Sequence, residues 1–118
     1  MKLTPKLESF LTKQFIFYCK KMKLELPMIL FRDEELGGMV EDHKEFKLTK
    51  KTRLGVSWYN KDTGLDFDVV YINVDASDFL WQLVDTVVHE LVHLKYPKLK
   101  HGDKFQKKIN TIMVESML

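Results

Sequence analysis

Residues 80–105 read LWQLVDTVVHELVHLKYPKLKHGDKF, and this stretch decides both the fold and the candidate site. Apolar side chains recur along it at the spacing of one face of an α-helix, namely Leu80, Leu83, Val84, Val87, Val88, Leu91 and Leu94. We predict a helix that is capped by Asp75 or Ser77 and runs to about Lys95, before Pro97 ends it. The opposite side is a polar stripe of Gln82, Asp85, Thr86, His89, Glu90 and His93. Because this stripe contains no lysine, it differs from an ordinary solvated helix surface.

The polar stripe contains the pattern His-Glu-x-x-His at positions 89–93. His89 and His93 stand one helical turn apart, so both imidazoles can reach one metal ion. Glu90 leaves the helix about 100° from His89, where it can contact a water on the metal without being a ligand. His101 follows a turn that contains proline, and a short loop can bring it back as a third ligand. Three protein ligands and an open position are typical of catalytic zinc, so we predict one Zn²⁺ per chain.

Three further residues have roles that the pattern leaves open. Glu115 is the alternative third ligand if His101 does not bind the metal. Asp85 lies one turn before His89, and it either accepts the second N–H of that imidazole or is an ordinary helix-surface aspartate. His43, in the sequence Glu-Asp-His-Lys, is expected to be an exposed loop residue.

The remaining sequence predicts a single α+β domain. Thr4 followed by Pro5 is a typical helix start. The expected elements are a helix over 4–23, strands within 27–32, 54–60 and 66–74, a turn at Gly37-Gly38, and a last helix over 102–118. The last two strands flank Asp-Thr-Gly and predict a hairpin or two neighbouring strands. A helix, three or four strands and two helices favour a sheet packed on helices, with Trp58, Trp81 and the phenylalanines in the core.

Composition is that of an ordinary globular domain. The chain has 118 residues, of which 45% are hydrophobic and 31% charged. Its one cysteine, Cys19, excludes an internal disulfide and a four-cysteine zinc ribbon. No apolar run approaches the ~18 residues of a membrane helix. Glu8 and Lys13 interrupt the apolar residues near the N-terminus, unlike in a signal peptide. We therefore expect a cytoplasmic protein without a membrane partner.

Basic residues gather in two clusters, although the formal net charge is only +2. The first cluster consists of Lys44, Lys47, Lys50, Lys51 and Arg53, and the second of Lys95, Lys98, Lys100, Lys104, Lys107 and Lys108. Such clusters can bind nucleic acid or an acidic substrate. A solvated lysine-rich surface is the simpler interpretation, and we favour it.

The sequence HELVHLKYPKLKHGDKF, with Asp85-Thr86-Val87-Val88 before it, resembles the active-site region of the SprT-like and minigluzincin group of small zinc metallopeptidases. The specific matches are His89, Glu90, His93, His101, Gly102 and Phe105. The short chain, without a cysteine-rich ribbon, favours the minigluzincin branch. The resemblance implies a small mixed sheet over the zinc-binding helix, with an extended substrate on the edge strand. That edge would be the strand at 54–60 or the one at 66–74, and we favour the first.

The residues and the resemblance together predict zinc-dependent hydrolysis of a peptide or protein substrate. Zinc would activate water, Glu90 would act as general base, and Tyr96 or Tyr59 would assist at the oxyanion. Related minigluzincins look latent through their C-terminal segments, so we expect a monomer or homodimer whose last helix controls access. Two alternatives stay open, a Spartan-like protease associated with DNA through the lysine clusters, and a non-catalytic metal-binding interaction protein.

Overall fold

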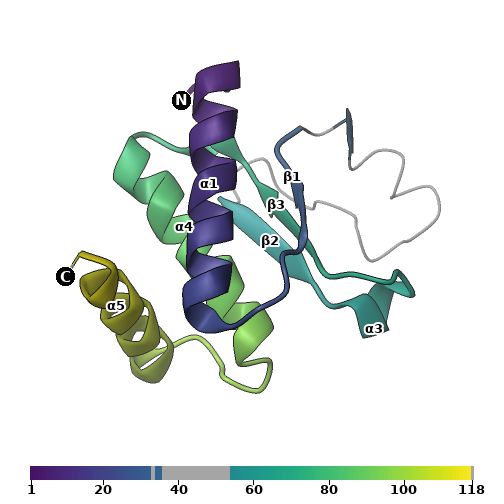
Figure 1. Cartoon of the computed structure of the whole chain (residues 1–118), viewed down its shortest axis with the longest axis vertical. Coiled ribbons are helices and arrows are strands. Elements are labelled where there is room, and N and C mark those ends of the chain that lie inside the picture. The colour runs from purple at the N-terminus through teal and green to yellow at the C-terminus, as the bar shows by residue number, and fades with distance from the viewer. Residues whose placement is uncertain (33, 36–53, 118) are drawn as a thin grey trace.

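The computed structural model of this chain describes residues 1–32, 34–35 and 54–117 (Figure 1). Three features expected from the sequence lie outside these residues: the turn at Gly37-Gly38, the loop residue His43 and the first lysine cluster. Within the described part of the chain, no helix has the length and apolar character needed to cross a membrane.

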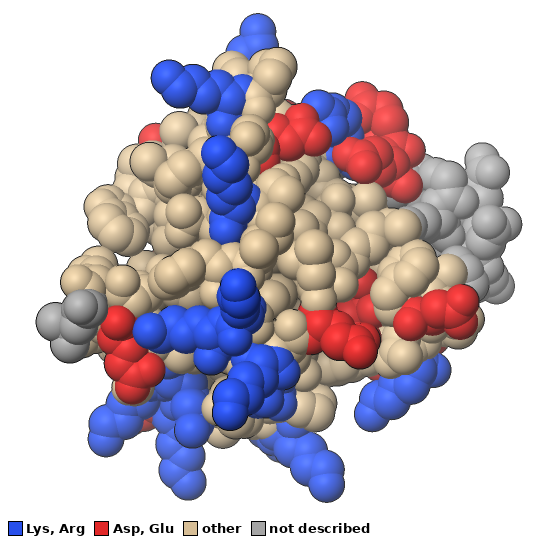
Figure 2. Space-filling view, in the orientation of Figure 1, with Lys and Arg blue, Asp and Glu red and all other residues tan. Residues whose placement is uncertain are grey.

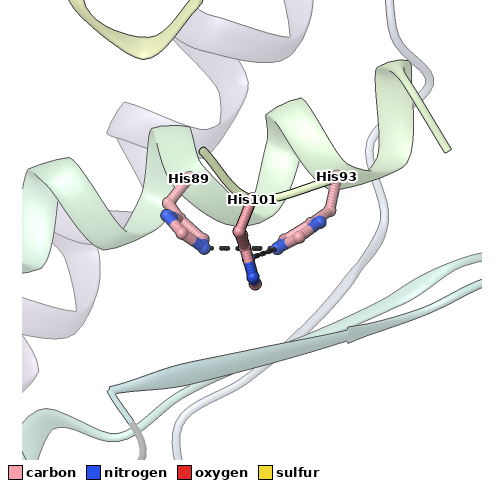
Figure 3. A group of neighbouring side chains, drawn as sticks. All are labelled: His89, His93 and His101. Carbon is pink, nitrogen blue, oxygen red and sulfur yellow. Dashed lines mark hydrogen bonds between the residues drawn. The ribbon is translucent and has the colours of Figure 1, made fainter. Parts of the chain in front are cut away.

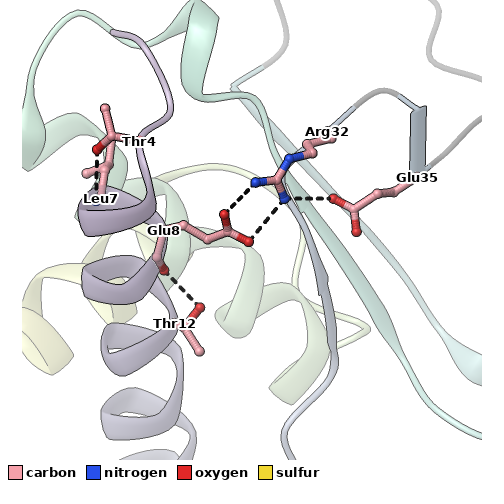
Figure 4. A network of polar contacts seen from close by, with 6 residues as sticks. All are labelled: Thr4, Leu7, Glu8, Thr12, Arg32 and Glu35. Atoms are coloured by element: carbon pink, nitrogen blue, oxygen red, sulfur yellow. Dashed lines mark hydrogen bonds and ion pairs between the residues drawn. The ribbon is translucent and has the colours of Figure 1, made fainter.

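Helix α1 (Pro5–Met22) begins and ends where the local sequence predicts. Thr4 is its N-cap, and the threonine hydroxyl accepts a hydrogen bond from the backbone N–H of Leu7 at 3.1 Å (Figure 4). At the other end, Lys23 adopts the left-handed conformation with a φ of 57°, and its N–H bonds back to the last turn. The expected helix over 4–23 is therefore confirmed.

The sheet has three strands among the described residues, β1 (Met28–Leu30), β2 (Gly55–Trp58) and β3 (Val69–Ile72). The strand order is β1-β3-β2, with β1 parallel and β2 antiparallel to β3. The short helix α3 (Asn60–Thr63) connects β2 to β3, and the 3-10 helix η2 (Val74–Ala76) follows β3. The predicted mixed sheet, and the pairing of its last two strands, are confirmed.

Alternate residues of β3 face the two sides of the sheet. Val70 and Ile72 belong to the main core, which lies between the sheet and the helices. Val69 and Tyr71 pack on the other side in a smaller cluster with Leu30 and Trp58. All four residues of β3 are buried, as expected of a central strand.

Helix α4 (Leu80–Lys95) is the centre of the molecule, and it contacts α1, the sheet and the last helix, α5 (Asp103–Met117). Figure 1 shows α1 in front of α4, the strands to one side and α5 to the other. The side chains that α4 buries are Leu83, Val84, Thr86, Val87, Val88, Glu90, Leu91, Val92 and Leu94. The α+β class, with an N-terminal and a C-terminal helix around α4, matches the prediction.

An exposed salt bridge fixes the end of β1 against α1. The Arg32 guanidinium donates to both carboxylate oxygens of Glu8, at 3.1 and 2.6 Å, and lies 3.5 Å from Glu35 (Figure 4). Because both partners are partly open to solvent, this bidentate pair orients the chain more than it stabilises the fold.

The expected start of α4 is wrong. The N-cap is Phe79, rather than Asp75 or Ser77, because η2 takes up the chain immediately after β3. No side chain caps α4 in the usual way, but the side-chain oxygen of Gln82 accepts a hydrogen bond from the N–H of Asp78 at 2.7 Å. This contact resembles one half of a capping box.

The expectation that all large aromatic residues are in the core is also wrong. Trp58 is buried, but Trp81 and Phe79 are each 58% exposed, and Phe17 and Phe67 are exposed too. Trp81 lies in the first turn of α4, two residues before Leu83, the first buried side chain of this helix. The residue type alone does not tell which helix face a side chain occupies.

Candidate metal centre

Three histidines converge on one point, as the sequence predicts (Figure 3). His89 and His93 come from neighbouring turns of α4, and His101 comes from the loop that precedes α5. The Nε2 atom of His93 lies 3.2 Å from that of His89 and 2.8 Å from that of His101. The three ligand atoms all lie within 4.8 Å of one another. Gly102, with a φ of 145°, provides the backbone conformation next to His101 that other residues rarely adopt.

These distances and the chemistry of the donors suit a single metal ion. Two nitrogens bound at ~2.05 Å on a tetrahedral ion lie about 3.3 Å apart, which is close to the observed separations. Burial, and then His101, lower the pKa of His89. Burial, with His89 and His101 nearby, lowers the pKa of His93 to about 4. Both imidazoles are therefore neutral at pH 7, and a neutral imidazole is the form that binds a metal.

Phe105 forms a buried wall behind all three imidazoles. Its ring centroid lies 4.8 Å from that of His89, 4.5 Å from that of His93 and 5.1 Å from that of His101. The side chain of Phe105 is only 2% exposed, so its position is fixed and it holds the imidazole rings in place. Phe105 belongs to the matched motif, but sequence reasoning did not assign it this supporting role.

Glu90 is buried beneath the edge of the sheet. It is 5% exposed, like the nearby Thr86, so the polar stripe of α4 is indeed not a solvated surface. A Cβ atom added to Gly55, the first residue of β2, would lie 2.8 Å from Cγ2 of Thr86 and 3.3 Å from Cγ of Glu90. The strand therefore passes directly over the helix turn that carries Glu90. Sequence reasoning missed Gly55, although a glycine in an otherwise β-branched strand is a signal of close backbone approach.

Tyr59 connects the sheet edge to the metal-binding turn. Its hydroxyl donates a hydrogen bond to the backbone carbonyl of His93 at 2.6 Å. Burial is the main cause that raises the pKa of Tyr59, followed by the negative charges of Asp62, Asp68 and Glu90. The tyrosine thus lies beside the site, as expected, but its proton is engaged with the helix backbone.

The other candidates are less closely associated with the three histidines. Tyr96 is the C-cap of α4, and its ring lies beneath Lys108, whose Nζ is 4.7 Å from the ring centroid. Asp85 is half-buried, which raises its pKa, but no hydrogen bond joins it to His89 among the described residues. Glu115 is exposed near the far end of α5 and is not part of the histidine group.

A hydrogen bond joins the end of α5 to α1. The hydroxyls of Tyr18 and Ser116 are 3.1 Å apart, whereas Val114 and Met117 are exposed. The expected control of access by this segment stays a prediction.

Comparison with protein-family models, with curated proteins and with solved structures gives no match. What the site can do therefore follows from its own geometry.

Proposed function

We propose that this protein is a zinc-dependent endopeptidase, similar to the SprT-like and minigluzincin enzymes. The observation that carries the proposal is the convergence of three imidazole nitrogens beside a buried glutamate in the pattern His-Glu-x-x-His. Three imidazole nitrogen ligands favour zinc over magnesium or calcium, which prefer oxygen. His89, His93 and His101 would hold the ion, and the fourth position would be open.

The protein side chains would supply the acid–base chemistry. When bound, zinc lowers the pKa of water towards ~7 and polarises a carbonyl group. Glu90 would accept the proton of the attacking water and deliver it to the leaving nitrogen of the peptide. Its burial under β2 keeps this carboxylate away from bulk water. Tyr59 holds the turn that carries His93, and Phe105 holds the imidazoles, so both position the site.

The sheet supports the choice of β2 as the substrate strand. Strand β3 pairs on both sides and offers no edge, whereas β2 pairs on only one side within the described part of the chain. Strand β2 also passes over Glu90, next to the histidines. An extended peptide that adds to the sheet along β2 would place its backbone at the open position of the metal.

The decisive experiment replaces Glu90 by glutamine. The amide keeps the shape of the side chain but cannot accept the proton, so cleavage of an unfolded test protein should fall by about 10²–10⁴-fold. Zinc content, measured by elemental analysis, should stay at one ion per chain. Glu115→Gln is the matched control, because it makes the same substitution at an exposed position of α5, and this variant should cleave as fast as the parent.

Two outcomes would contradict the proposal. If Glu90→Gln cleaved as fast as the parent with contaminating protease excluded, the mechanism would be wrong. If the parent bound one zinc ion and cleaved no peptide, the protein would instead be a non-catalytic metal-binding protein.

A further inference from the structure

Positive charge is concentrated in the segment that carries the third histidine. Residues 95–110 contain six lysines and one acidic residue, Asp103, so they carry a net charge of +5. The whole chain carries +2, so the rest of the molecule carries −3. We call these lysines the basic rim: Lys95, Lys98, Lys100, Lys104, Lys107 and Lys108. All six are exposed. Figure 2 shows Lys and Arg side chains gathered along the lower edge of the molecule, below α1 and α5.

The basic rim surrounds the chain positions that form the candidate metal centre. Lys95 is the last residue of α4, two positions after His93. Lys100 directly precedes His101, and Lys104 directly precedes the buried wall Phe105. The chain segment that supplies the third histidine is therefore also the most basic segment of the molecule.

None of the acidic residues that the structure describes forms an ion pair with the rim. Within the described part of the chain, the ion pairs involve Arg32 alone, and Lys108 instead lies over the ring of Tyr96. Apart from Lys108, the lysines of the rim make no ion pair or cation–π contact with the described residues, so their charges are available to a ligand.

The arrangement is electrostatically unfavourable without a ligand. Lys104, Lys107 and Lys108 lie in the first two turns of α5, at three- and four-residue spacing, where like charges repel. They also lie at the end of the helix where the backbone dipole already favours negative charge. A metal ion bound by the adjacent imidazoles would add further positive charge. Stability does not account for this placement, whereas an anionic ligand does.

We propose that the basic rim selects acidic peptide segments, so that the enzyme prefers substrates with aspartate and glutamate next to the cleaved bond. This inference rests on the proposed peptidase function and names its substrate class. We take the anionic groups to be carboxylates, because a peptide is the ligand that the proposed function brings to this site. Lys100 is the direct chain neighbour of His101, so we expect the rim to act on ligands of the metal centre rather than on a separate surface.

Binding is measured on zinc-loaded Glu90→Gln protein, by the anisotropy of two labelled peptides. The peptides share one central sequence, which is flanked by glutamates in the first and by glutamines in the second. The glutamate peptide should bind about tenfold more tightly at low salt, and the difference should shrink as salt is added. Parent protein should cleave the glutamate peptide with the higher kcat/KM.

Two double variants locate the effect. Lys104→Glu with Lys107→Glu should abolish the preference for the glutamate peptide. Lys6→Glu with Lys13→Glu changes the net charge equally on the exposed side of α1, and it should keep the preference. Both pairs are exposed, and negative charge near the start of α5 is favourable, so the rim variant should melt no lower than the parent.

The outcomes separate this inference from the peptidase itself. The inference would be overturned if both peptides bound equally, or if both double variants lost the preference for the glutamate peptide to the same extent. Cleavage by the parent protein would still support the peptidase in either case. Tighter binding of a single-stranded DNA oligonucleotide than of the glutamate peptide, with a steep salt dependence, would overturn it in favour of nucleic acid. Rim-dependent binding of the glutamate peptide without any cleavage would uphold the acidic ligand and refute the peptidase.

Discussion

A methyl group added at Gly55 tests how closely β2 approaches α4. The positive-φ glycines of the described chain are Gly64 and Gly102, so the backbone at Gly55 accepts alanine without strain. The new Cβ would lie 2.8 Å from Cγ2 of Thr86, 3.1 Å from the carbonyl oxygen of Tyr71 and 3.3 Å from Cγ of Glu90. The first distance is shorter than real carbon contacts, and Thr86 is buried, so either the strand or the helix has to move.

The expected loss of stability follows from the close contact that the new methyl group would make. Gly55→Ala should lower the free energy of unfolding by about 1–3 kcal/mol, the range for an extra methyl in a packed interior. Thr86→Ser alone should lower it by ~1 kcal/mol, because it removes one buried methyl but keeps the hydrogen bond from the hydroxyl to the carbonyl of Gln82. In the double variant the alanine methyl fills the space that Cγ2 leaves. The two changes should therefore couple favourably by ~1–2 kcal/mol.

Urea unfolding of the four proteins in this cycle measures the coupling, and each kcal/mol corresponds to about 4 °C in Tm for a domain of this size. Gly64→Ala is the matched control. Gly64 has a φ of 78° and open space around its missing Cβ, so alanine there should cost about 1 kcal/mol through the backbone. Thr86→Ser should not relieve that cost. Additivity of Gly55→Ala and Thr86→Ser within ~0.5 kcal/mol would refute the close approach.

Three further predictions concern the residues around the histidines. Tyr59→Phe removes the hydrogen bond to the His93 carbonyl, so the free energy of unfolding should fall by ~1 kcal/mol. Zinc should also bind more weakly in a chelator competition, and an unchanged zinc affinity would contradict a positioning role for Tyr59. Phe105→Ala should lower the unfolding free energy by about 3–5 kcal/mol and weaken zinc binding, whereas a fully stable variant would show that the wall is not packed. The metal-free protein should lose stability as the pH falls from ~6.5 to about 4. In the unfolded chain His93 takes up a proton near its ordinary pKa, whereas in the folded chain its pKa is about 4, so protons favour the unfolded state within this window. A melting temperature that stays constant across this window in the absence of metal would contradict the lowered pKa.

Features that depend only on residues close together in the chain could be predicted from the sequence. Thr4 and Pro5 specify the start of α1 because capping depends on neighbouring residues alone. The i, i+4 spacing of His89 and His93 follows from the helix period, and the short turn to His101 limits how far the third imidazole can go. These are the features that the structure confirms most closely.

Contacts between segments that are distant in the chain could not be predicted from the sequence. The hydrogen bond from Tyr59 to His93 joins residues 34 positions apart, and its donor comes from a different element. The contact of Gly55 with Thr86 depends on how the sheet packs on α4, which no local pattern specifies. The exposure of Trp81 was missed for a related reason, since a hydrophobic residue at the start of a helix has no fixed partner until the whole core is assembled.

The strand order has a consequence for how the chain folds. Met28 of β1 pairs with Val69, and Gly55 of β2 pairs with Ile72, so both outer strands are synthesised before the strand that joins them. These long-range pairings cannot form on the ribosome until β3 has emerged, and they raise the contact order of an otherwise helical domain. Helix α4, which covers the sheet, emerges later still. Helix α5, which adds buried side chains to the same core, emerges last. The segments that complete the hydrophobic core are thus α4, which carries the first two histidines, and α5, which follows the third, so core assembly and site assembly become one late event.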